Sequence, residues 1–155
     1  MYNLRVPGGT YKGIIGECMF KLTRRYLILP KFFNKFKYFK IFSDRLSLEE
    51  KNFLNKYWFS IDALEFDYSK KPRKIVLFEI KTISNPSFCD HKPEEMIKMT
   101  LATHNIYTEA KSLGFDVKIA IVELLDNWNY EVELVDFDKC NYYVDKPKKY
   151  DLPLG

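Results

Sequence analysis

The chain is poor in glycine, histidine and cysteine, and it has no long uninterrupted apolar run. Its 155 residues include 6 Gly, 2 His and 3 Cys, and no stretch approaches the ~20 apolar residues that a membrane span needs. The cysteines are far apart and odd in number, which excludes a zinc-binding pattern and fits a reducing compartment. The N-terminal residues lack the apolar stretch of a signal peptide. We therefore expect an intracellular protein, in a cell or host cytoplasm, that is neither secreted nor membrane-spanning.

Acidic residues are almost absent from the first quarter of the chain. Residues 1–40 hold nine Lys or Arg and one acid, Glu17, whereas residues 41–155 hold 16 basic and 20 acidic side chains. The net charge of +4 therefore comes from the N-terminal part. A basic segment on a weakly acidic body fits a polyanionic partner, and a solvated lysine surface explains the charge equally well.

Apolar and aromatic side chains are abundant. Hydrophobic residues make up 46% and aromatic residues 17% of the chain, which excludes disorder and provides a core for one domain. Helices are expected at residues 10–24, 48–56 and 93–113, and strands at 25–29, 57–68, 74–83, 117–125 and 130–137. Residues 85–92 are expected to be a loop and residues 139–155 an irregular tail. This order predicts an α/β sandwich with a central mixed sheet flanked by helices.

Two acids and a lysine occupy matching positions of the expected hairpin. With its turn centred between Lys70 and Lys71, Asp62 on the first strand lies opposite Glu79, with side chains about 5 Å apart. Lys81, two residues further on, shares that face. Burying two carboxylates side by side has a desolvation cost that a divalent cation between them would offset. The pattern predicts a metal site with a lysine beside it, which is typical of phosphodiester hydrolysis.

This arrangement resembles the PD-(D/E)XK nuclease superfamily. Residues 61–62 (Ile-Asp) stand at the place of its Pro-Asp, and residues 79–81 (Glu-Ile-Lys) at the place of its (D/E)-x-K. Residues 12–17 match the K-G-x-x-x-E that begins archaeal Holliday-junction resolvases. The resemblance implies a single-domain, restriction-endonuclease-like α-β-β-β-α-β sandwich with its core at about residues 10–137. Residues 30–56 would be an insertion that carries substrate preference.

The resemblance also implies the roles of the site residues. Mg²⁺ or Mn²⁺ would be held by three carboxylates and one backbone carbonyl, those of Asp62, Glu79, Glu17 and Ile80. Lys81 would orient the attacking water or help to deprotonate it. Together with this lysine, the three acids are the expected catalytic residues.

Other polar residues are expected to be secondary to these. Phosphate contacts with DNA are expected from Lys12, Arg24, Arg25, Lys31, Lys35, Lys37 and Lys40. Accessory candidates on the second helix of the core, expected at 93–113, are Lys98, His104 and Tyr107. A regular strand turns Glu65 away from Asp62, so Glu65 is a ligand only if the strand is bulged.

The sequence therefore favours a Mg²⁺- or Mn²⁺-dependent deoxyribonuclease, with DNA as its partner and endonuclease activity preferred. Its rivals are a non-catalytic nucleic-acid-binding module on the same fold and an adaptor protein with an unrelated sandwich. The motifs leave a junction resolvase, an exonuclease and a general endonuclease open. A resolvase would act as a homodimer because paired nicks need two sites. In its Lys, Phe and Tyr content, the chain resembles small proteins of archaeal viruses.

Overall fold

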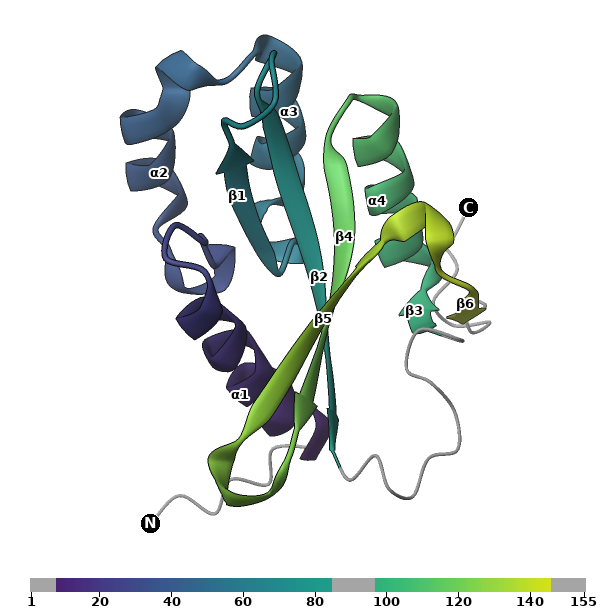
Figure 1. Ribbon diagram of the computed structural model, residues 1–155. Helices are drawn as coiled ribbons and strands as arrows, with labels where there is room; N and C mark the ends of the chain where they lie inside the picture. Colours follow the sequence, from purple (N-terminus) through teal and green to yellow (C-terminus); the bar gives the residue numbers. More distant parts are fainter. Residues whose placement is uncertain (1–7, 85–96, 146–155) are drawn as a thin grey trace.

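Four strands form the centre of the molecule (Figure 1). In the computed structural model, which describes residues 8–84 and 97–145, these strands lie in the order β1-β2-β4-β5. Their bounds are Ala63–Asp67 for β1, Lys74–Ser84 for β2, Asp116–Leu124 for β4 and Tyr130–Asp136 for β5. β2 is antiparallel to β1 and parallel to β4, and β4 is antiparallel to β5. The prediction of a mixed central sheet in an α/β fold is therefore confirmed.

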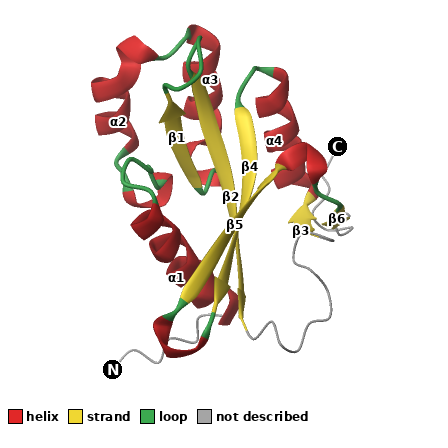
Figure 2. Ribbon diagram, viewed as in Figure 1, coloured by secondary structure: helices red, strands yellow, loops and turns green. Residues whose placement is uncertain are grey.

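Helices pack on both faces of this sheet (Figure 2). α1 (Gly8–Thr23) contacts β2 and β4 on one face, where Phe20 and Phe78 meet edge to face. The other face is covered by α2 (Lys35–Phe42), α3 (Leu48–Tyr57) and α4 (Leu101–Ser112). None of the helices in residues 8–84 and 97–145 is long and apolar enough to cross a membrane.

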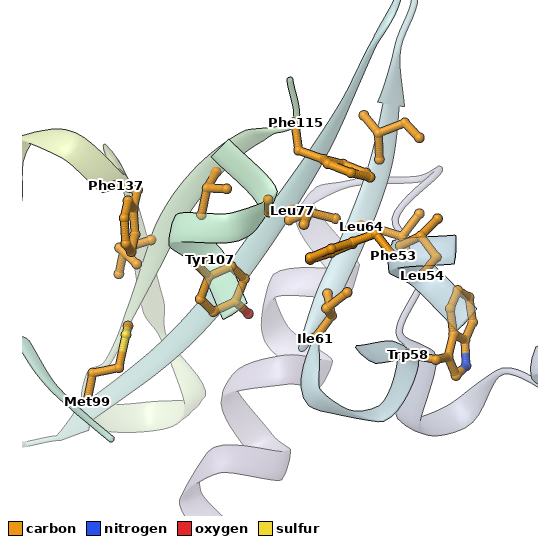
Figure 3. Packing of buried hydrophobic residues seen from close by; sticks show 14 of the residues in the cluster. Phe53, Leu54, Trp58, Ile61, Leu64, Leu77, Met99, Tyr107, Phe115 and Phe137 are labelled. Atoms are coloured by element: carbon orange, nitrogen blue, oxygen red, sulfur yellow. The ribbon is translucent and has the colours of Figure 1, made fainter. Parts of the chain in front are cut away.

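The larger core lies between the sheet and α2, α3 and α4 (Figure 3). Its largest fully buried side chains include Trp58, Tyr38 and Tyr107. α3 begins at Leu48 because Ser47 and Glu50 form a reciprocal capping box at its N-terminus. β2 is central because Ile75, Val76, Leu77 and Phe78 are buried on both of its faces.

The hairpin of β1 and β2 has the predicted register. Ala63 pairs with Phe78, and Asp67 pairs with Lys74. Asp62 directly precedes β1 and, in continuation of this register, lies beside Glu79. The predicted juxtaposition of these two acids is confirmed.

The first expected hairpin strand, residues 57–68, begins later than predicted. α3 continues through Tyr57, and a 3-10 turn, η3 (Trp58–Ser60), follows before β1 starts at Ala63. Trp58 and Ile61 continue the apolar spacing of α3 and are buried in the larger core, so tertiary packing extends the helical segment. Asp62 therefore lies at the entrance of the strand, whereas the sequence placed it in mid-strand.

Three other predictions need correction. The strand expected at residues 25–29 is reduced to a single antiparallel bridge between Ile28 and Leu64. The described part of the helix expected at 93–113 begins with a strand, β3 (Ile97–Thr100), before α4. β3 pairs in parallel with β6 (Tyr142–Asp145), so this part of the expected irregular tail is regular. The loop expected at residues 85–92 lies outside the described residues.

Candidate functional site

Glu79 is held in the interior by a tyrosine from α4. The Tyr107 hydroxyl donates a hydrogen bond to Glu79 Oε2 over 2.7 Å, and Tyr107 is completely buried. On the other side, Lys81 Nζ lies 3.6 Å from Glu79 Oε1. Glu79 and Lys81 thus share one face of β2, as predicted, and Lys81 keeps about a third of its side chain exposed.

Asp62 meets the same strand from the start of β1. Its Oδ2 accepts a hydrogen bond of 2.9 Å from the Ile80 backbone amide, and its carboxyl group is close enough to that of Glu79 to influence the pKa of Glu79. Ile80 therefore contacts Asp62 through its amide, and the proposed role of its carbonyl as a metal ligand stays a prediction. Two carboxyl groups this close share a proton unless a cation lies between them.

Glu17 approaches from α1 and is paired with a lysine. Lys31 Nζ donates to Glu17 Oε1 over 2.9 Å, and the charge of Lys31 also acts on Asp62. Glu17 is only 5% exposed, and its second oxygen, Oε2, is buried with no hydrogen-bond partner in the described parts of the chain. We call Glu17, Asp62 and Glu79, with Lys31 and Lys81 beside them, the acid cluster.

Burial raises the pKa of all three carboxyl groups. For Glu79, burial and then the neighbouring charge of Asp62 raise the pKa to about 8. Burial raises the pKa of Asp62 in spite of the hydrogen bond from the Ile80 amide. Burial likewise raises the pKa of Glu17 in spite of the hydrogen bond from Lys31. The fold therefore keeps carboxylates together where ionisation is unfavourable, which is typical of functional sites.

The donor set fits a hard divalent cation. Mg²⁺ and Mn²⁺ prefer carboxylate oxygens, and such an ion would replace the proton shared by Asp62 and Glu79. The unpartnered Oε2 of Glu17 is a further oxygen donor. Within residues 8–84 and 97–145, however, no three acid, histidine or cysteine side chains already converge as a metal group. Coordination by all three acids would therefore require them to move closer together, and Glu17 could use Oε2 while Oε1 stays paired with Lys31.

Several residues considered from the sequence lie away from the acid cluster. Glu65 faces away from Asp62, as predicted, and its carboxylate accepts two hydrogen bonds from Arg24. The His104 ring packs against Phe137 and Tyr142, with centroids 5.3 and 5.1 Å apart. Lys98 was expected on the second core helix, and it lies on β3 with an exposed side chain.

The cations expected to contact phosphate fall into two groups. Arg24 and Lys31 are bound to acids, Glu65 and Glu17, so their availability for phosphate is reduced. The remaining ones lie on α1, α2 or the segment between them, with side chains at least partly exposed: Lys12, Arg25, Lys35, Lys37 and Lys40. DNA contact by these five stays a prediction.

One close approach at the site was not predicted from the sequence. A Cβ on Gly16 would lie 1.8 Å from Thr82 Oγ1, so only glycine allows α1 to come this close to β2. Thr82 Oγ1 is itself buried without a hydrogen-bond partner in the described residues. The available signal was Gly16, which directly precedes Glu17 and occupies a variable position of the K-G-x-x-x-E pattern. A glycine inside a helix can mark a place where the helix backbone lies against another element.

Comparison of the chain with protein-family models, curated proteins and solved structures finds no match. The chemistry of the acid cluster is therefore the basis for assigning a function. The most informative parts of that chemistry are the paired carboxyl groups of Asp62 and Glu79 and the adjacent Lys81.

Proposed function

We propose that the protein is a Mg²⁺- or Mn²⁺-dependent deoxyribonuclease that hydrolyses phosphodiester bonds, with endonuclease activity. The main support is that Asp62, Glu79 and Lys81 meet at one place, in the spatial relation expected from the sequence. Buried acids that lack enough partners are costly, so a cluster of them favours a cation-dependent role.

The order of elements also supports a restriction-endonuclease-like fold. α1 is followed by the Ile28 bridge, β1, β2, α4 and β4. This order agrees with the expected α-β-β-β-α-β sandwich if the Ile28 bridge is taken as a reduced first strand, if α2 and α3 are taken as the insertion before β1, and if β3, which lies outside the central sheet, is left out. β5 then extends the sheet beyond β4.

The residues of the acid cluster would divide the work of hydrolysis. When bound, the cation would polarise the scissile phosphate and lower the pKa of a coordinated water. Asp62 and Glu79 would hold the ion, while Tyr107 fixes the orientation of Glu79 through its hydrogen bond. Lys81, partly exposed beside Glu79, is placed to position the water and to stabilise the negative charge that develops on phosphate.

The test is cleavage by purified protein in Mg²⁺ or Mn²⁺, with supercoiled plasmid, linear duplex, single strands and a four-way junction as substrates. We expect plasmid nicking that EDTA stops and that Glu79→Gln abolishes. Glu133→Gln, on an exposed position of β5, is the matched control and should cleave like the wild type.

Three results would contradict this proposal. Cleavage that persists in EDTA, or full activity of Glu79→Gln, would exclude a metal role for the acid cluster. DNA binding without nicking, across both metals and a range of pH, would favour the non-catalytic binding module. Paired symmetric nicks in the junction would identify a resolvase, and degradation from ends an exonuclease.

A further inference from the structure

A groove with exposed aromatic rings lies next to the acid cluster. It has a volume of about 630 Å³ and lies between η1 (Pro30–Phe32), α2 and η3. Three phenylalanines in its lining are largely exposed: Phe32 at 59%, Phe36 at 80% and Phe59 at 72%. We call this hollow the phenylalanine groove.

These three rings are not needed to attach α2 to the rest of the fold. Tyr38 and Phe39 pack on Trp58, with ring centroids 4.5 and 5.7 Å apart, and Phe42 packs on Phe66. α2 is therefore already fixed to the sheet by its inward rings. Several large apolar side chains left in water around one hollow indicate a binding surface.

The charges around the phenylalanine groove indicate a polyanion. Lys31 and Lys35 line it, and no acidic residue is among its described lining residues. Phe32 and Phe33 also line a neighbouring hollow with Lys21, Arg25 and Tyr26, where the Arg25 guanidinium lies 5.5 Å from the Tyr26 ring centre. Aromatic rings and cations therefore lie together on the surface between α1 and α2.

The groove is continuous with the acid cluster through Lys31. This residue lines the groove, and its ammonium group lies 2.9 Å from Glu17 Oε1. A strand whose bases occupy the groove would thus have its phosphates directed along Lys31 towards Asp62 and Glu79. Bases in a duplex are already stacked on each other, whereas unpaired bases have free faces for aromatic rings.

We propose that the phenylalanine groove binds unpaired nucleotides, so that the substrate is single-stranded DNA or DNA with an unpaired segment beside the cleaved bond. Phe36 and Phe59 stack on bases, and Lys35 contacts the phosphates between them, while Lys31 stays paired with Glu17 where the groove meets the acid cluster. The statement about the substrate rests on the proposed nuclease function. The binding of unpaired nucleotides does not depend on metal or on cleavage.

The experiment measures DNA binding in EDTA by fluorescence anisotropy. The probes are a labelled oligothymidylate of about 15 nucleotides, within the range that single-strand sites cover, and a blunt hairpin duplex of similar length. We expect the wild type to prefer the single strand. Phe36→Ala and Phe59→Ala should each weaken single-strand binding by about five-fold or more and leave duplex binding within about two-fold.

Two controls separate stacking from general damage. Trp128→Ala removes an aromatic side chain that is 82% exposed on η6 (Asp126–Trp128), away from the groove, and should bind both probes like the wild type. Phe36→Trp keeps a stacking ring and should retain single-strand affinity. Circular dichroism of every variant confirms that the fold is unchanged.

Three outcomes would overturn the inference. These are equal affinity for duplex and single strand, unchanged single-strand affinity in Phe36→Ala and Phe59→Ala, or a loss equal to that in Trp128→Ala. Absence of any DNA binding would be a fourth such outcome and would leave a protein as the partner to test. Glu79→Gln should bind the single strand like the wild type. Single-strand binding can therefore be confirmed even if the protein proves not to cleave DNA.

Discussion

Glu50 and the carboxyl groups of the acid cluster differ in how completely they are paired with hydrogen-bond donors. Glu50 on α3 receives two hydrogen bonds from the Arg73 guanidinium, at 2.9 and 3.2 Å, and one of 2.8 Å from the Ser47 amide. Burial acts to raise the pKa of Glu50, but the hydrogen bonds from Arg73 and Ser47 outweigh it and lower the pKa. In the acid cluster the balance is opposite, because burial prevails and the pKa of each carboxyl group is raised.

The Glu50–Arg73 pair stabilises the fold, whereas the acid cluster lowers the stability of the fold. A bidentate arginine compensates a carboxylate for the water it loses. Lys81 at 3.6 Å and one lysine on Glu17 do not compensate three acids. We infer that the Glu50–Arg73 pair is structural and that the acid cluster is kept for its chemistry. Substitutions at the Glu50–Arg73 pair should therefore affect stability, and substitutions in the acid cluster should affect chemistry.

The largest effect is expected from Asp62→Asn. This change removes one of the two carboxylates that would hold the cation, so metal-dependent cleavage should fall by more than about 100-fold. The free energy of unfolding should not decrease, because the repulsion between Asp62 and Glu79 is removed. Cleavage rates and urea unfolding of the same preparation check both parts, and strong destabilisation would mean that Asp62 is structural.

The opposite outcome is expected from Arg73→Met. Removing the guanidinium leaves Glu50 with only the Ser47 amide as a donor and the Arg45 carbonyl without its bond from Arg73, and should lower the free energy of unfolding by about 1–3 kcal/mol. Cleavage per folded molecule should stay within about two-fold of the wild type. Urea unfolding and cleavage assays measure these effects, and a selective loss of cleavage would place Arg73 in the site.

Two glycines of α1 test how closely Glu17 must approach the sheet. Gly16→Ala would place a Cβ against Thr82 and should destabilise the protein by about 1–3 kcal/mol through overpacking. Gly13→Ala meets nothing within 4 Å and should stabilise the helix by about 0.5–1 kcal/mol. Thermal unfolding compares the two variants. Equal effects would show that α1 does not pack tightly on β2.

The mildest perturbation is a change of pH, which alters no residue. In EDTA, the unfolded chain releases the proton of Glu79 near its ordinary pKa of 4.5, whereas the folded protein keeps it up to about 8. Stability should therefore fall as pH rises through this interval, by at most about 1.4 kcal/mol per unit. Glu79 is surrounded by Asp62, Tyr107, Lys81 and Lys31, and Glu79→Gln should remove most of the slope. A flat profile in the wild type would contradict the raised pKa.

The register of the acid cluster could be predicted because it depends on local pattern. A turn centred between Lys70 and Lys71 places Asp62 beside Glu79, and two-residue alternation places Lys81 on the same face. The helical spacing and the isolation of Glu17 in a basic segment indicated α1. These signals are read within one element or one hairpin, where sequence distance and spatial distance agree.

Other features depended on contacts between distant residues. β3 forms because it pairs with β6, about 45 residues further along the chain, and nothing in residues 97–100 alone separates this strand from a helix start. The pairing of Lys31 with Glu17 likewise requires the turn after α1, which the sequence suggested only as a strand. Tyr107 was one of several accessory candidates, and only the packing of α4 selects it as the partner of Glu79.

Calorimetric titration of the metal-free protein with Mn²⁺ would show whether the acid cluster is poorly paired because it binds a divalent cation. The wild type should bind the ion with proton release at pH 7, because Asp62 and Glu79 give up their shared proton. Glu79→Gln should lose this binding, and Glu133→Gln should keep it. Absence of Mn²⁺ binding by the wild type, or equal binding by Glu79→Gln, would contradict the account.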